Sequence, residues 1–351
     1  MNIREPLSAP EPQEIFCAPD VVRIIHPRHE FPPLLHFPAF STGSPTTPYG
    51  VSRFLLLDAC RVLTNHAANY QEDFLASDSQ GEDRLEINDT PLNVNCYYFL
   101  GPPEVEANRD YPIVKSLSAL RFPSVLPAHW ARIAERRPPR PYDYRISPEP
   151  SMMTDLVRRR DRVCTITACP DATQCAHLIP KADEAWFLAN HMSDDYIGDY
   201  NNMRASRTSD IDHPANGILL RADVRLCLDS HAFVFYPADC TGELEDGTFV
   251  AYFVDEGYKL LPDVIHRRPV AIPQDVPVEF LYARFAHTII SLRYHNPMFS
   301  SVPDLPMVEV IRRRLQELAQ KEAQEALDAS SEGSGEDWRW CVVFCYSVGT
   351  G

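Results

Sequence analysis

Two proline-dense runs most constrain how this chain of 351 residues can fold. They lie at residues 26–40 (HPRHEFPPLLHFPAF) and 136–150 (RRPPRPYDYRISPEP). Proline donates no backbone hydrogen bond, and it disfavours helix both at its own position and at the preceding residue. The second run therefore predicts a domain boundary. We expect a flexible leader at 1–19, a proline-rich amino-terminal α/β domain at 20–145 and a second domain at 151–240.

The spacing of apolar residues predicts an α+β protein. Helices are expected at 50–70, 151–162 and 278–296, and an aromatic strand at 92–101. A β/α extension is expected at 241–300, packed on the second domain. Residues 301–351 are expected to hold a charged helix (308–327) and a disordered tail, because ASSEGSGEDW has almost nothing to bury.

Charge and composition narrow the possible partners. The formal net charge is −16, so a nucleic acid would have to meet a local basic patch against the overall field. The longest apolar run, FLLLDACRVL, is broken by Asp58 and is too short to span a bilayer, so no membrane association is expected. Ten cysteines without a secretory signal indicate reduced thiols and an intracellular location, cytoplasmic or nuclear. The sequence leaves the oligomeric state open.

Two segments of the second domain carry the chemistry. Residues 160–180 (RDRVCTITACPDATQCAHLIP) predict two short strands joined by a turn at PDAT and ending in a loop at His177. Residues 213–237 (HPANGILLRADVRLCLDSHAFVFYP) predict a helix that Asn216 opens and that runs to about Asp229, followed by a strand. The predicted order is strand, strand, helix.

This order resembles the HNH endonucleases, the ββα-metal or His-Me finger family, and looks closest to fungal HNH-domain proteins. The residues that match the family pattern are Ala176-His177-Leu178-Ile179-Pro180, Trp186-Phe187, Asn190, Met192, Asn216-Gly217-Ile218-Leu219-Leu220-Arg221, Asp223 and Asp229. Several elements that agree in order and spacing are more specific than any single short motif. The resemblance implies a ββα-metal core, with carboxy-terminal helices added after it.

The resemblance also implies a mechanism. In this family the histidine of the first motif deprotonates water for in-line attack on a phosphodiester, and one divalent metal such as Mg²⁺ stabilises the developing charge. His177 is then the general base and Asn216 the residue that orients it. The family's metal ligands usually lie just before the base and nine residues after the asparagine, which are Ala176 and Arg225 in this chain.

Those two positions depart from the family pattern. Ala176 has no donor atom, and the guanidinium of Arg225 stays protonated and repels a divalent cation. A metal ion would need other ligands, for which His213, Asp223 and His231 are the weak candidates, beside Asp212 and Asp229. The replaced ligands therefore argue against metal-dependent activity.

Arg225 has two possible roles. One is an i, i+4 salt bridge with Asp229 on the predicted helix, which we prefer. The other is a catalytic role, in which the guanidinium occupies the position of the metal and binds a phosphate or another anion directly.

Local charge and the cysteines give no strong support for DNA binding or zinc. Residues 151–240 contain nine Lys or Arg and thirteen Asp or Glu. Only 158–162 (RRRDR) and 136–141 (RRPPRP) concentrate positive charge, and solvated surfaces are the preferred interpretation. Cys164, Cys169 and Cys175 lack the spacing of a zinc knuckle, so buried free thiols are expected.

Three functions remain open. The first is an HNH nuclease that hydrolyses DNA or RNA with His177 as general base and a divalent metal as cofactor. The second is a catalytically degenerate HNH-fold protein that acts as a binding or scaffold protein. The third is an HNH-fold enzyme that acts on a non-nucleic-acid substrate with His177 and Arg225. Since a fold does not fix its chemistry, the site has to decide between them.

Overall fold

A computed structural model of the chain describes residues 21–27, 33–40, 49–65, 73–93, 95–101, 113–137, 153–193, 210–241, 247–255 and 261–295. They belong to one compact unit that extends to Ser301. The predicted leader, charged helix and tail lie outside the described residues, as does most of the second proline run. The mixture of helices and sheets confirms the predicted α+β class.

The amino-terminal part contains a four-stranded sheet in the order β2-β1-β4-β3. Its strands are β1 (Val21–Ile25), β2 (Leu35–Pro38), β3 (Phe74–Ala76) and β4 (Cys96–Leu100). The central pair β1 and β4 is parallel, whereas the two outer pairs are antiparallel. Strand β4 lies within the strand predicted at 92–101.

Two further sheets follow along the chain. Strands β5 (Thr173–His177) and β6 (Gly217–Arg221) form an antiparallel pair. Strands β7 (Phe233–Pro237), β8 (Phe249–Phe253) and β9 (Arg268–Val270) form an antiparallel sheet in that order.

Seven α-helices are described in the parts of the chain that the structure covers. They are α1 (Arg53–Thr64), α2 (Ala128–Arg136), α3 (Met153–Asp161), α4 (Glu184–Ala189), α6 (Ala222–Asp229), α7 (Leu261–Ile265) and α8 (Val278–His295). Ser52 caps the start of helix α1, since its side chain accepts from Leu55 N, and Asn65 caps the end in the left-handed conformation. Helices α1, α3 and α8 confirm the helices predicted at 50–70, 151–162 and 278–296. Among the described helices, none combines the length and apolar character needed to cross a bilayer.

The predicted ββα segment was wrong in two details. Residues 163–168 form turns rather than a first strand, so the hairpin partner of β5 is β6. Strand β6 follows after an acidic connector, the segment 181–212 between the two motif segments. The helix begins at Ala222, because residues 217–221 (GILLR) form β6 instead of its first turn. A short run buried on both faces has no clear periodicity, so a strand and a helix cannot be told apart in it.

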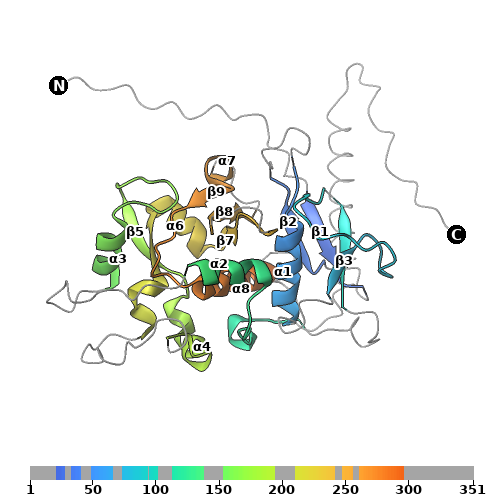
Figure 1. The fold of residues 1–351 in the computed structure, drawn as a ribbon, viewed down its shortest axis with the longest axis horizontal. Coiled ribbons are helices and arrows are strands. Elements are labelled where there is room, and N and C mark those ends of the chain that lie inside the picture. The colour runs from blue at the N-terminus through green and yellow to red at the C-terminus, as the bar shows by residue number, and fades with distance from the viewer. Residues whose placement is uncertain are drawn as a thin grey trace, which may run out of the picture. The chain divides into compact units, whose positions relative to one another are not determined.

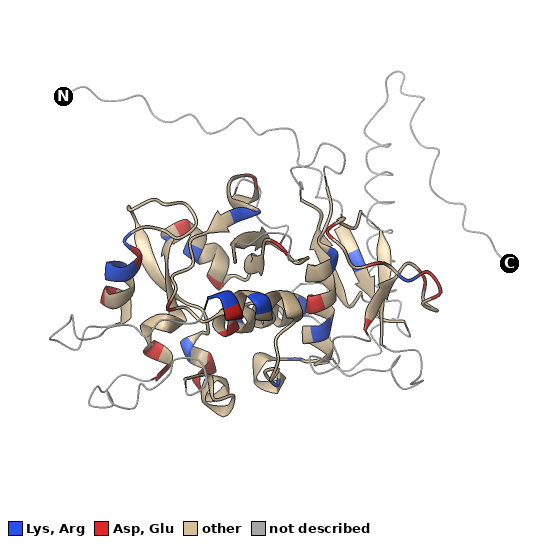
Figure 2. Cartoon of the chain, in the orientation of Figure 1, with Lys and Arg blue, Asp and Glu red and all other residues tan. Residues whose placement is uncertain are grey.

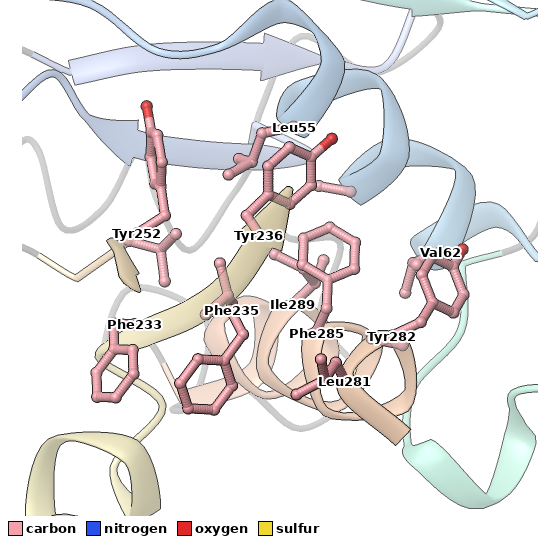
Figure 3. Packing of buried hydrophobic residues seen from close by; sticks show 14 of the residues in the cluster. Leu55, Val62, Phe233, Phe235, Tyr236, Tyr252, Leu281, Tyr282, Phe285 and Ile289 are labelled. Carbon is pink, nitrogen blue, oxygen red and sulfur yellow. The ribbon is translucent and has the colours of Figure 1, made fainter. Parts of the chain in front are cut away.

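Helix α8 is the centre of the core. It packs against β7, α1, α2 and the short 3-10 helix η2 (Leu117–Ala119), and Figure 1 shows it alongside α2. Figure 3 shows Leu281, Phe285 and Ile289 of α8 facing Phe235 and Tyr236 of β7. This packing joins elements from both sides of the proline run at 136–150, while the predicted domain boundaries stay predictions.

A buried carboxylate strengthens the same junction. Asp58 Oδ2 in α1 accepts hydrogen bonds from His129 Nε2 at 2.8 Å, Trp130 Nε1 at 3.0 Å and Tyr236 Oη at 2.8 Å. These donors come from α2 and β7, and all four residues are buried. A carboxylate is costly to bury unless such donors surround it. Asp58, the acidic residue in the apolar run FLLLDACRVL, thus links α1 to α2 and β7.

Candidate active site

The β5–β6 ladder places His177 at the end of β5. Its partner in the register is Gly217, and Ala176 pairs with Ile218. Cys175, on one face of β5, packs with Met153 and Val157 of α3. A Cβ atom at Gly217 would overlap Met153 and lie 2.9 Å from Val157 Cγ2, so α3 approaches the ladder closely only because residue 217 is glycine.

The opposite face of β5 meets α6. Gln174 Oε1 accepts a hydrogen bond from Arg225 of α6 at 3.1 Å. Since side chains alternate along a strand, Ala176 lies on the same face as Gln174. Positions 176 and 225, at which the resemblance implied metal ligands, therefore share the face that α6 covers.

Asn216 holds the loop that follows His177. Its Oδ1 accepts from Ile179 N at 2.9 Å, and its Nδ2 donates to Ile179 O at 3.0 Å and to Ile211 O at 2.9 Å. The side chain is fully buried, and Leu178 N donates to the Asn216 carbonyl at 2.9 Å. Because both the acceptor and the donor of this amide are used, Asn216 fixes two segments at once, one beside His177 and one ending in Asp212.

His177 and Asp212 form a hydrogen-bonded pair. His177 Nε2 lies 3.1 Å from Asp212 Oδ1, and the other carboxylate oxygen, Oδ2, lies 2.6 Å from Lys181 Nζ. The bond to Asp212 raises the pKa of Lys181, so this residue is cationic. An ionised carboxylate only accepts hydrogen bonds, so the contact with Asp212 favours the imidazole tautomer that carries its proton on Nε2. The lone pair of Nδ1 is then the one that can take a proton.

Arg225 makes the predicted salt bridge. Its Nε lies 3.3 Å from Asp229 Oδ2, and the side chain is 37% exposed. The hydrogen bonds and ion pairs of Arg225 and His177 run to different partners. A catalytic role of Arg225 together with His177 therefore stays a prediction.

The three weak metal candidates lie in other environments. His213 is buried, its Nδ1 accepts from Ala215 N at 3.1 Å, and burial lowers the pKa of its imidazole to about 3. Asp223 is bound by the fork of Arg221 at 2.7 Å through both oxygens. The ring of His231 lies 4.7 Å from that of His287 in α8. None of these contacts brings a further ligand to His177.

The residues present do not fit a divalent ion. Ala176 offers no donor, and the Arg225 guanidinium is held beside position 176 by Gln174. Asp212 already shares its oxygens between His177 and Lys181. Within the described ranges, no three His, Cys, Asp or Glu side chains gather in a way that could hold a metal. A stable site for Mg²⁺ needs several oxygen ligands, which the side chains around His177 do not supply.

Two residues of the site were not predicted in their observed roles. Lys181 was not expected at the site, and Asp212 was expected only as a metal ligand. The contact of Asp212 with His177 spans 35 positions along the chain, and no local pattern marks such a pair. The acidic connector before Asn216 was the only signal, since it placed a carboxylate near the turn that carries the asparagine.

The cysteines of the hairpin region are thiols. Cys164 and Cys175 are buried, Cys169 is half-buried, and all three are free. Burial raises the pKa of the Cys175 thiol to about 11, which keeps it protonated and unreactive. The predicted intracellular location stays a prediction.

Strands β5 and β6 and helix α6 form a ββα unit, with a histidine at the end of the first strand and an asparagine that fixes the loop after it. Residues 162–236 match the model of a protein family described as HNH endonuclease. Searches of curated proteins and of solved structures gave no match. The family match confirms the predicted HNH domain, whereas the likeness to fungal proteins stays a prediction.

Proposed function

We propose that the HNH domain hydrolyses phosphodiester bonds with His177 as general base and Asp212 as the residue that orients it. The observation that carries this proposal is the 3.1 Å contact between His177 Nε2 and Asp212 Oδ1. In the proposed reaction Nδ1 of His177 removes a proton from water, and the hydroxide attacks phosphorus in line. The P–O bond to the leaving oxygen breaks, and that oxygen takes a proton from solvent.

The charge that develops on the phosphate needs a cation, and the chain offers one beside the dyad. Lys181 Nζ lies 2.6 Å from Asp212 Oδ2 and its side chain is 62% exposed. In the proposed reaction this ammonium stabilises the charge on the phosphate. The proposed reaction therefore requires no divalent ion.

A specific observation favours a second candidate, a binding or scaffold role without catalysis. Four of the seven Lys and Arg side chains that the structure describes in residues 151–240 pair with carboxylates: Arg160 with Asp161 and Asp275, Arg221 with Asp223, Arg225 with Asp229 and Lys181 with Asp212. Figure 2 shows basic and acidic positions interleaved on α2 and α3. Binding of a polyanion such as DNA or RNA depends on cations that are free to contact phosphates.

Hydrolysis assays with one small diester and two nucleic acids distinguish the catalytic role from the binding or scaffold role. Bis(p-nitrophenyl) phosphate, supercoiled plasmid and single-stranded RNA would each be incubated with the full chain, in excess EDTA and in Mg²⁺ or Mn²⁺. We expect hydrolysis in EDTA that falls by about 100-fold or more in His177→Ala and by a smaller factor in Asp212→Asn, as for removal of a general base. His191→Asn is the matched control, because His191 is exposed and has φ 53°, which asparagine tolerates.

Each outcome is informative. Hydrolysis that requires Mg²⁺ or Mn²⁺ would overturn the metal-free reaction. Cleavage of the small diester alone would favour an enzyme that acts outside nucleic acids with His177 and Arg225. If no substrate is cleaved by the folded wild-type chain, the binding or scaffold role replaces the catalytic one.

A further inference from the structure

Arg160, in the last turn of α3, is the most heavily bonded side chain near the candidate site. Its guanidinium donates to two backbone carbonyls, Pro214 O at 2.9 Å and Gly217 O at 2.6 Å. It also pairs with Asp161 at 2.5 Å and with Asp275 at 2.9 Å. Only 10% of the side chain is exposed. Arg160 lies outside residues 162–236, the part of the chain that matches the HNH family.

The two carbonyls have a special position. Pro214 and Gly217 flank Ala215 and Asn216. Arg160 therefore donates hydrogen bonds to the backbone before and after the turn that carries the asparagine. The short helix η7 (Pro214–Asn216) is only one turn long and is not stable by itself. Contacts from elements outside η7 are therefore needed to keep Asn216 in place.

Asp161 extends this hold to β6. Its Oδ2 accepts from Leu219 N at 2.8 Å, two residues after Gly217. The carboxylate of Asp161 is itself fixed by Arg160 through both oxygens. The end of α3 thus bonds to three backbone atoms, Pro214 O in η7 and Gly217 O and Leu219 N in β6.

Asp275 supplies the second anion. It lies in the loop before α8, 115 positions from Arg160 along the chain, and its side chain is 10% exposed. Two carboxylates around one buried guanidinium offset the cost of its burial. The planar fork of arginine can serve both carbonyls and both carboxylates at once, which the single ammonium of lysine cannot do.

We infer that Arg160 is a positioning residue for the candidate active site. It fixes the turn that carries Asn216; Asn216 in turn fixes Ile179 and Ile211, and these segments set the distance between His177 and Asp212. The catalytic consequence rests on the proposed function, whereas the geometric consequence does not.

Three variants test the inference in the full chain. Arg160→Met removes all donors, Arg160→Lys keeps the charge but loses the fork, and Arg159→Met is the control on an exposed neighbouring position of the same helix. Amide hydrogen exchange of Ile179, whose N–H is bonded to Asn216, measures whether Asn216 still holds the loop after His177. This measurement does not depend on enzymatic activity. Amides of the β7–β8 ladder, such as Tyr236, report the rest of the core.

A second readout concerns the imidazole itself. The ¹⁵N shifts of His177 distinguish the Nε2-protonated tautomer, which the bond to Asp212 favours, from the Nδ1-protonated one. In Arg160→Lys we expect exchange of Ile179 at least about tenfold faster than in the wild type, a mixed tautomer at His177 and unchanged exchange in β7. If the wild type cleaves a phosphodiester, kcat should fall about 100-fold while KM stays within about twofold.

The proposed function and the positioning role of Arg160 can be disproved independently of each other. If the wild type cleaves nothing, the proposed function is lost, and the exchange of Ile179 still decides the role of Arg160. If Arg160→Met does not fold, Arg160→Lys decides alone. A folded Arg160→Lys chain with wild-type exchange at Ile179 and a wild-type tautomer at His177 would overturn the inference.

Discussion

The guanidinium of Arg225 lies 3.3 Å from the carboxylate of Asp229, one turn further along α6. This pair places a cation at the helix position at which the HNH family is expected to carry a metal ligand. It also neutralises that cation on a partly exposed surface. The consequence is that position 225 contributes neither a ligand nor a strong free charge to the domain.

The energetic weight of the pair is small. Arg225→Ala should lower the free energy of unfolding by less than about 1 kcal/mol, because partly exposed i, i+4 pairs contribute about 0.3–0.5 kcal/mol. Urea denaturation of the full chain measures the difference, with Asp229→Ala as the matched partner variant. A loss above about 2 kcal/mol in Arg225→Ala alone would show that the guanidinium has a structural partner beyond Asp229 and Gln174.

Asn216 should be far less tolerant. Asn216→Ala leaves the N–H and C=O of Ile179 and the C=O of Ile211 without their partner in a fully buried place. We expect a loss of about 2–4 kcal/mol in the free energy of unfolding, measured by urea denaturation. Asn216→Asp keeps the acceptor but sets an anion against two carbonyls, so it should be no better. Wild-type stability in either variant would show that the side-chain hydrogen bonds of Asn216 do not stabilise the fold.

One buried histidine, His213, and one half-buried histidine, His266, predict a dependence of stability on pH. Burial lowers the pKa of His213 and of His266 to about 3 in each case. Below pH 6.5 the unfolded chain binds protons that the folded chain does not, so stability is full above that pH and falls as the pH is lowered towards 3. Each histidine should contribute a loss of about 2 kcal/mol between pH 7 and pH 5.

Replacement of His213 isolates its share. His213→Asn keeps an acceptor for Ala215 N, as asparagine is a good residue at the start of a helix, but it does not titrate. Its loss of stability between pH 7 and pH 5 should be about 2 kcal/mol smaller than that of the wild type. Equal slopes in the two proteins would mean that His213 is protonated in the folded chain.

The matched segment should not fold alone. Residues 162–236 lack β8, with which β7 pairs, and α8, against which Phe235 and Tyr236 pack. They also lack Arg160 and Asp58, which bond to Gly217 and Tyr236. A fragment of these residues should show poor dispersion in its NMR spectrum, whereas a chain of residues 21–301 should show the dispersion of a folded protein. A well-dispersed spectrum of the short fragment would contradict this dependence.

The sequence was sufficient for features that depend on nearby residues. Helices α1, α3 and α8 follow from apolar spacing, and the HNH domain follows from short motifs in a fixed order. The salt bridge between Arg225 and Asp229 follows from helix geometry, because residues four apart lie on one face. The prediction failed at residues 217–221, where a fully buried strand carries no alternation of apolar and polar residues.

The amino-acid sequence by itself determined that a histidine would end a strand, whereas the helix that it predicted directly after Asn216 is the strand β6. Only the tertiary structure decided what surrounds them: Asp212 on His177, Lys181 on Asp212 and Arg160 around the Asn216 turn. The reason is physical. Periodicity and capping act over a few neighbouring residues, whereas the contacts of His177 with Asp212 and of Arg160 with Asp275 span 35 and 115 positions and form only when the core packs.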